Sequence, residues 1–208
     1  MINNLSIFEK NIGYIFNDKS LLINALTHTS YSYENKTKSN ERLEFLGDSI
    51  LEFISSKYLY SNYKNLSEGE MTKVRASAVC EESLYKIANK LNFNDFLYLG
   101  KSEKTSNTKK KAILADSVEA VIAAIYLDSN IQQAEKFIIE NIKDEIEFAS
   151  KNVGLKDYKT HLQEILQKNG DVDIKYNIVN EEGPDHDKTF TVEILVNNKK
   201  ICNGTRKK

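Results

Sequence analysis

Proline is almost absent from this sequence, and its absence is the strongest constraint on the fold. Residues 1–150 contain no proline, and Pro184 is the only one in the chain. Over the same stretch apolar residues recur at helical spacing, as in Leu43, Leu46 and Ile50. Because proline disrupts helix interiors, its absence agrees with this periodicity, and we predict a mainly α, all-helical domain at 1–150. Polar stretches predict the breaks between helices, at Tyr31–Ser39, Asn62–Ser67, Gly100–Lys111 and Asp128–Asn130.

The pattern changes near residue 151, and a smaller α+β domain is expected after it. The expected elements are a linker at 151–156, a helix at Asp157–Lys168, and strands at Tyr176–Asn180, Thr189–Val196 and Lys200–Cys202. Phe190, Val192 and Ile194 alternate with polar residues, which is the period of a half-buried strand. Asn197 and Asn198 supply a turn before the last strand. Residues 157–208 therefore predict the order helix, strand, strand, strand.

The composition excludes several classes of protein. A hydrophobic content of 40% is too high for a disordered chain. No run of about 18 apolar residues and no signal-peptide pattern is present, so we expect no membrane partner. Cys80 and Cys202 are far apart and indicate free thiols in a reducing cytoplasm. The net charge of −1 gives no overall sign of nucleic acid, so such a partner must be argued from local features.

Three acidic residues share one face of a predicted helix in the segment 40–52. At about 100° per residue, Glu41, Glu44 and Asp48 fall within roughly 60° of one another, with Leu43 on the opposite side. Like charges at this spacing repel one another and destabilise a helix. The simpler alternative, which stays open, is a solvated face whose first acids are favoured by the helix dipole.

A second predicted helix carries acidic residues in apolar surroundings. Residues 113–127 are apolar almost all round, which predicts burial, yet Asp116 and Glu119 lie on one face. Buried carboxylates cost several kcal/mol each without compensation, and this segment contains no Lys or Arg. Mg²⁺ or Mn²⁺ would compensate, because hard ions prefer oxygen ligands. The alternative is that both acids lie at an exposed edge or cap neighbouring helices.

Other kinds of site fit the sequence less well. None of the three histidines has a glutamate three residues before it, which excludes the Glu-x-x-His di-iron pattern. Zinc clusters and glycine-rich phosphate loops are also absent, so no small-molecule cofactor is expected. An all-carboxylate Mg²⁺ site, which suits phosphoryl transfer, remains. The local interpretation of Glu68 is the first turn of a helix, because Ser67 and Glu70 have capping-box spacing.

At this point a family resemblance becomes specific. The segments Asn40–Asp48, Glu68–Ala76 and Leu114–Ala120 resemble the signature of the ribonuclease III family. Asp157–Glu164 and Gly183–Phe190 resemble the double-stranded-RNA-binding domain that follows the nuclease domain in its bacterial members. The resemblance covers nearly the whole chain, and its blocks occur in the family order.

The resemblance implies a homodimer of helical nuclease domains and a role for each acid. It places the Mg²⁺ ligands on Glu44, Asp48, Asp116 and Glu119. It makes Asp48 and Glu119 catalytic, with Glu41 and Glu68 assisting from the valley between subunits. Phe45 matches an aromatic knob that enters the partner subunit, and the helical wheel places it on the polar side.

The implied activity is Mg²⁺-dependent hydrolysis of phosphodiester bonds in double-stranded RNA, with Mn²⁺ as a possible substitute. The family leaves 5′-phosphate and 3′-hydroxyl ends, and its bacterial members process precursors of ribosomal and other RNAs. The alternative is a double-stranded-RNA-binding protein that does not cleave. The six acids argue against it, since a binding module has no need for mutually repelling carboxylates facing phosphates.

The RNA-binding residues are also assigned by the resemblance. They are Thr160, His161, Gln163 and Glu164 in the expected helix and His186 in the expected loop between strands. In the family a Lys-rich second helix follows the third strand, whereas this sequence ends at Lys208. We therefore expect an incomplete, marginally stable binding domain with weak affinity for RNA.

Overall fold

The chain divides into two compact units, Met1–Gly154 and Leu155–Lys208. The computed structural model describes residues 5–101, 103, 110–153, 162, 165–168, 172–183 and 188–207. The first unit is helical in its described residues, and the second contains a small antiparallel sheet. The predicted fold class, mainly α with a small α+β segment after it, is confirmed.

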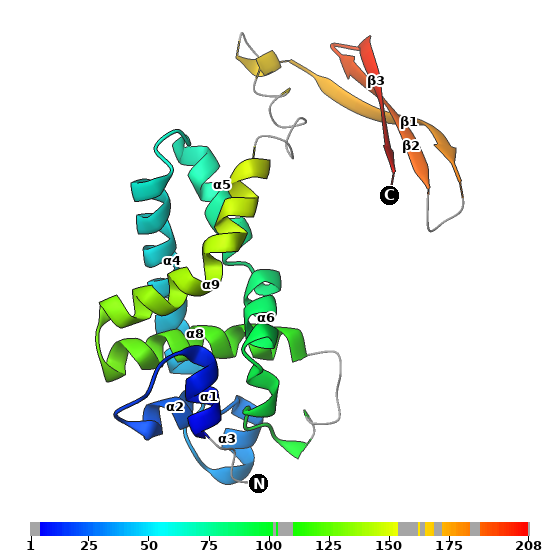
Figure 1. Ribbon diagram of the computed structural model, residues 1–208. Helices are drawn as coiled ribbons and strands as arrows, with labels where there is room; N and C mark the ends of the chain where they lie inside the picture. The colour runs from blue at the N-terminus through cyan, green and yellow to red at the C-terminus, as the bar shows by residue number, and fades with distance from the viewer. Residues whose placement is uncertain are drawn as a thin grey trace. The chain divides into compact units, whose positions relative to one another are not determined.

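The first unit is built from helices of very different lengths. They are α1 Leu5–Ile12, α2 Lys19–Ala25, α3 Thr29–Asn35, α4 Glu41–Asn62, α5 Glu68–Ala78, α6 Glu81–Lys90, the 3-10 helix η1 Phe93–Asp95, α8 Lys110–Asp128 and α9 Ile131–Asn152. In Figure 1, α8 runs across α4, and α9 continues beside α5, with which it is in contact. The last helix includes Lys151 and Asn152, the first two positions of the expected linker.

Helix α8 forms the centre of the core. Every residue from Ile113 to Ile125 is buried except Asp116 and Glu119, which are half-buried. The helix packs against α2, α4, α6 and α9, which explains why it is apolar on almost every side. Its predicted burial is therefore confirmed. No helix among the described residues is both long enough and apolar enough to cross a membrane.

One predicted break between helices is wrong in its first part. The segment Tyr31–Ser39 was expected to be irregular, but Thr29–Asn35 forms α3. The ring Nδ1 of His28 accepts a hydrogen bond from the Ser30 amide and caps this helix. The Gly100 amide also donates a hydrogen bond of 2.9 Å to Ser30 Oγ. This contact spans 70 residues, so the local sequence pattern could not reveal it.

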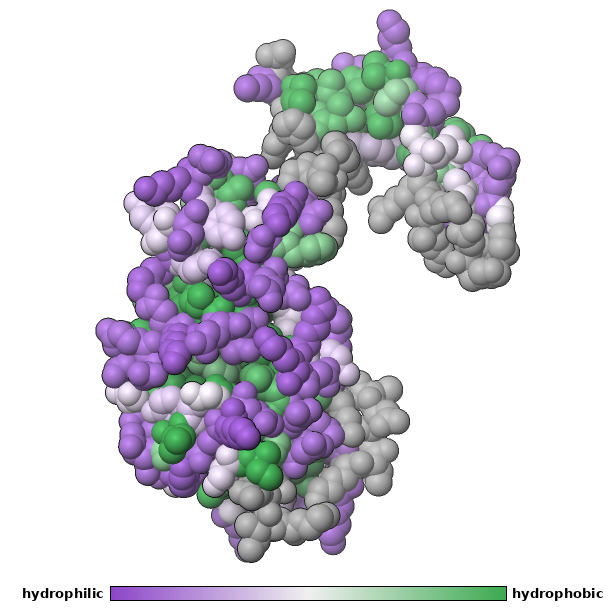
Figure 2. Space-filling view, in the orientation of Figure 1, coloured by the Kyte–Doolittle hydropathy of each residue, from purple (hydrophilic) through white to green (hydrophobic). Residues whose placement is uncertain are grey.

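The second unit contains a three-stranded antiparallel sheet of order β1-β2-β3. Its strands are β1 Ile174–Glu182, β2 Thr189–Val196 and β3 Lys199–Lys207. Asn197 and Asn198 have φ angles of 51° and 62°, as a tight type I′ hairpin turn requires. The three predicted strands are confirmed, with β1 and β3 extending beyond their apolar residues. Figure 2 shows apolar side chains gathered on the sheet.

Of the predicted helix Asp157–Lys168, only Leu162 and 165–168 lie within the described residues.

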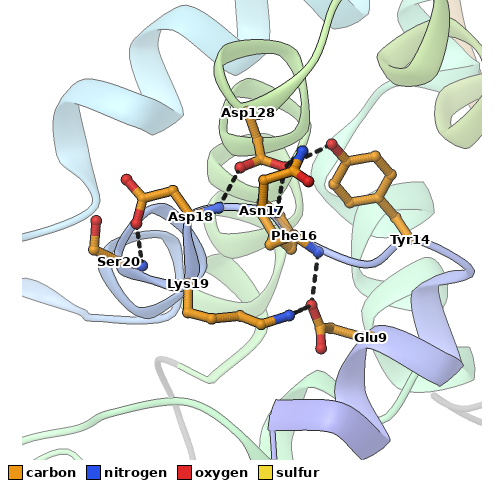
Figure 3. Close-up of polar contacts among 8 residues, drawn as sticks. All are labelled: Glu9, Tyr14, Phe16, Asn17, Asp18, Lys19, Ser20 and Asp128. Carbon is orange, nitrogen blue, oxygen red and sulfur yellow. Dashed lines mark hydrogen bonds and ion pairs between the residues drawn. The ribbon is translucent and has the colours of Figure 1, made fainter.

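A polar network ties the N-terminal helices to the end of α8 (Figure 3). The Asp128 carboxylate accepts hydrogen bonds from Tyr14 Oη at 2.7 Å and from the backbone amides of Asn17 and Asp18 at 2.9 and 2.7 Å. Partial burial opposes the charged form, but the hydrogen bonds outweigh it and hold the Asp128 pKa below its usual value. The network fixes the position of α8 from its C-terminal end.

We expect Asp128→Asn to destabilise the helical unit by about 1–2 kcal/mol at pH 7, because charge-assisted hydrogen bonds are lost. The folded-state pKa of Asp128 is depressed, so the stabilisation is present above the unfolded pKa and is lost as the pH falls through the folded pKa. Urea denaturation, followed by the helical circular dichroism signal, should therefore give a lower free energy of unfolding for the variant than for wild type at pH 7. In acid the two free energies should become equal. Asp144→Asn, on the exposed surface of α9, is the matched control. If the difference in unfolding free energy between variant and wild type persisted unchanged in acid, the stabilising role of the Asp128 carboxylate would be contradicted.

Candidate active site

The candidate site lies where α4 and α8 cross. At the crossing Gly47 is so close to α8 that a Cβ atom on it would lie 1.8 Å from the backbone oxygen of Glu119. Real Cβ atoms do not approach an oxygen so closely, so this position requires glycine. Because Asp48 is the next residue in α4, the close approach brings its backbone beside that of Glu119. The packing of two helices thus joins the two acidic segments of the sequence.

Glu119 is the most strongly perturbed carboxyl group of this region. Burial raises its pKa to about 8, and the negative charges of Asp48, Asp116 and Glu44 add to the effect. Glu52 also contributes to this repulsion. A nearby cation would strongly favour the ionised form of Glu119. Its positive charge would offset both the cost of burial and the repulsion from the neighbouring carboxylates, which together raise the pKa.

Two neighbouring acids are perturbed for the same reasons. Burial raises the pKa of Glu44, and the charges of Asp116, Glu41 and Asp48 reinforce the increase. Burial also raises the pKa of Asp116, with a further contribution from Glu81, whereas His28 acts in the opposite direction. The acids on α4 and those on α8 therefore share one electrostatic environment. We call Glu44, Asp48, Asp116 and Glu119 the four-carboxylate site.

The donor chemistry of the four-carboxylate site fits a hard divalent cation. All its side-chain donors are carboxylate oxygens, which Mg²⁺ and Mn²⁺ prefer. Within the described ranges, however, no group of three or more His, Cys, Asp or Glu side chains is already arranged to hold a metal ion. The carboxylates are thus coupled electrostatically, as the mutual effects on their pKa values show, without being arranged around a single point.

The other predicted site residues are placed as follows. Glu41 is exposed at the start of α4, where Ser39 Oγ donates a hydrogen bond of 2.8 Å to it. Glu68 begins α5, and it borders a cavity between α4 and α5. Phe45 is 77% exposed on α4, as the helical wheel predicts. The predicted RNA-binding residues lie outside the described residues, and they are Thr160, His161, Gln163, Glu164 and His186.

Sequence reasoning missed Gly47, which packs α4 against α8, and Glu52, whose charge acts on Glu119 from outside the four-carboxylate site. A glycine inside a helix costs about 0.5–1 kcal/mol relative to alanine, so its presence could have signalled a close backbone approach. Glu52 continues the four-residue spacing of Glu44 and Asp48, which was also visible. Neither signal reveals which neighbour is involved, because that depends on how the helices cross.

Comparison with known proteins gives the family. A family model described as Ribonuclease-III-like matches residues 18–146, and one for the double-stranded RNA binding motif matches residues 158–208. Ribonuclease 3 of Clostridium perfringens is 49% identical to this chain over 203 residues, which are 97% of the chain and 86% of that protein. The chain belongs to the ribonuclease III family. Ribonuclease 3 of Caldanaerobacter subterraneus subsp. tengcongensis, another similar protein, is 45% identical over 92% of the chain and 86% of its own length.

Solved structures agree with the ribonuclease III assignment. The nuclease domain of ribonuclease III from Campylobacter jejuni is 39% identical, with a TM-score of 0.64, over 68% of this chain and 98% of that one. That domain is described as having structural flexibility in a region involved in dimer formation. Dicer from Pichia stipitis shares the fold at 22% identity and a TM-score of 0.52, covering 92% of this chain and 87% of that one. The predicted family and enzyme class, an endoribonuclease, are confirmed.

Proposed function

We propose that this ribonuclease III family member is a Mg²⁺-dependent endoribonuclease that hydrolyses phosphodiester bonds in double-stranded RNA. The products are 5′-phosphate and 3′-hydroxyl ends. The observation that carries the proposal is the convergence of two acidic helices at Gly47 and Glu119. The segment that matches the double-stranded RNA binding motif supports the choice of substrate.

Each acid has a proposed task. Glu44, Asp48, Asp116 and Glu119 would hold Mg²⁺, or Mn²⁺ in its place. When bound, the ion supplies charge stabilisation at phosphate oxygens and a more acidic water. Asp48 and Glu119 orient the reacting groups from opposite sides of the helix crossing. Glu41 and Glu68, which are both exposed, are proposed to assist from the valley between the two subunits of the dimer.

A homodimer is proposed because cutting both strands of a duplex requires two sites. The exposed aromatic ring of Phe45 projects from the helix that carries Glu44 and Asp48. A large apolar group at such a place favours a partner surface. The dimer-forming region described for the Campylobacter jejuni nuclease domain supports the same assembly.

We infer that the RNAs are precursors of ribosomal and other RNAs in the cytoplasm, where the free, exposed thiols of Cys80 and Cys202 would remain reduced. The contacts proposed for Thr160, His161, Gln163, Glu164 and His186 with RNA are predictions.

The direct test incubates long double-stranded RNA with the full chain and Mg²⁺, in parallel with single-stranded RNA of the same sequence. We expect cleavage of the duplex alone, complete inhibition by excess EDTA, recovery with Mg²⁺ or Mn²⁺, and 5′-phosphate on the products. Binding of the duplex without any cleavage would favour the non-cleaving alternative. Products with 5′-hydroxyl ends would contradict the proposed chemistry.

We expect Phe45→Ala to weaken the dimer by roughly 30-fold or more, since a central aromatic anchor contributes about 2 kcal/mol or more to an interface. Sedimentation over a range of concentrations measures the change. The matched control is Tyr33→Ala on α3, which removes an aromatic side chain that is 92% exposed. Equal dimer affinity of both variants would exclude Phe45 from the interface, and a monomeric wild type would contradict the two-site proposal.

A further inference from the structure

Arg75 of α5 holds two successive turns of α4. Its Nε lies 2.7 Å from a carboxylate oxygen of Glu52, and its Nη1 donates a hydrogen bond of 2.7 Å to Ser56 Oγ. Ser56 Oγ in turn donates to the backbone oxygen of Glu52 at 2.7 Å. The planar guanidinium therefore fixes both the side chain of Glu52 and the turn that follows it.

Glu52 belongs to the same row of acids as the four-carboxylate site. It follows Glu44 and Asp48 at four-residue spacing, and each such step turns about 40° around the helix and rises about 6 Å. Its charge acts on Glu119 across the helix crossing. Glu52 is thus within electrostatic range of the site, yet its carboxylate is engaged by an arginine from another helix.

The face of α5 that carries Arg75 also carries Glu68. Both residues border a cavity of about 210 Å³ between α4 and α5, together with Ser56 of α4. Thr72, one turn from Glu68, donates a hydrogen bond of 3.3 Å to its carboxylate. The anchoring of Arg75 to α4 therefore sets which face of α5, with its glutamate, meets this cavity.

We propose that Arg75 is a positioning residue that holds the Glu52 carboxylate against α5 and keeps a fifth acid out of the four-carboxylate site. The inference rests on the proposed function of that site. Without the guanidinium, Glu52, whose side chain is 38% exposed, becomes an unpaired negative charge one helical turn from Asp48. It then attracts a divalent cation away from the productive ligands, and it repels the phosphates of the RNA.

A double-mutant cycle separates this role from simple bridging of the two helices. Arg75→Ala should lower kcat/KM at least about tenfold, because the extra charge is released. Glu52→Gln removes the charge and should stay within about threefold of wild type. The double variant should also return to within about threefold, although the bridge is absent from it.

A second measurement does not depend on cleavage. Calorimetric titration of each RNA-free protein with Mn²⁺ should show binding about threefold to tenfold tighter in Arg75→Ala, because one positive charge is removed beside the site. The double variant should match wild type. Arg75→Lys, which keeps the charge but not the two-pronged geometry, should bind Mn²⁺ with an affinity near that of wild type. Helical circular dichroism and melting temperature verify that each variant folds.

The proposal is overturned if Glu52→Gln is as damaging as Arg75→Ala and the double variant shows no recovery, because Arg75 then only bridges the helices. Unchanged Mn²⁺ affinity in a folded Arg75→Ala protein overturns it as well. If wild type binds Mn²⁺ but cleaves no RNA, the proposed function fails, and the Mn²⁺ cycle still decides the role of Arg75.

Discussion

Glu119→Gln should reduce kcat for duplex cleavage by about a thousandfold or more, because a carboxylate is removed from the centre of the four-carboxylate site. The variant retains the shape of the side chain, so RNA binding should change little. In metal-free buffer the variant should be more stable than wild type. Burial and the charges of Asp48, Asp116 and Glu44 disfavour the ionised form of Glu119, which the variant lacks.

The pH dependence of this stabilisation has a definite sign. The folded-state pKa of Glu119 is about 8, above its ordinary value of 4.5, so wild type loses stability as the pH rises between these values. The neutral variant avoids that loss, and its melting point in EDTA should exceed that of wild type most at pH 8 and little at pH 4. The exposed Glu140→Gln variant of α9 is the control for removing a glutamate charge. Full cleavage activity in a folded Glu119→Gln protein would refute the site assignment.

Much of the fold could be predicted because it depends on local pattern. The apolar circumference of α8 predicts its burial, since a helix packed on several sides needs apolar residues on each of them. The alternation in Thr189–Val196 predicts β2 for the corresponding reason in a sheet. By contrast, α3 is short and polar, and it depends on the cap from His28 and on the distant Gly100 amide. The local pattern carries no information about the second of these contacts, which joins residues 70 positions apart.

In the candidate site, too, the local spacing of residues could be predicted, whereas the contact between helices could not. The spacing of Glu44 with Asp48, and of Asp116 with Glu119, predicts two acidic faces, but no single-sequence pattern specifies that these faces meet. Their meeting depends on the crossing of α4 and α8, which the structure places at Gly47. The ion pair of Glu52 with Arg75 likewise joins residues 23 positions apart, and it required the packing of α5 on α4.

Gly47→Ala should destabilise the helical unit by about 3 kcal/mol or more and abolish cleavage, because overpacking of a rigid contact forces backbone shifts. The new methyl group would lie 1.8 Å from the Glu119 oxygen and 2.5 Å from its carbonyl carbon. Both atoms belong to the backbone, so no side-chain rotation can relieve the clash. The two helices must separate, and the acids on α8 move away from those on α4. Urea denaturation and the duplex cleavage assay measure the two effects.

Gly69→Ala provides a matched control for this prediction. Gly69 also lies in a helix, α5, but a Cβ atom there would meet nothing within 4 Å. The same substitution should therefore stabilise the protein by about 0.5–1 kcal/mol, because alanine restricts the unfolded chain and favours the helix. The two variants add one methyl group each within a helix, so composition cancels in the comparison and helix propensity changes in the same direction. A difference of several kcal/mol between them isolates the helix crossing as the cause. If Gly47→Ala were as stable as Gly69→Ala and still cleaved RNA, the close approach of α4 to Glu119 could not be what assembles the site.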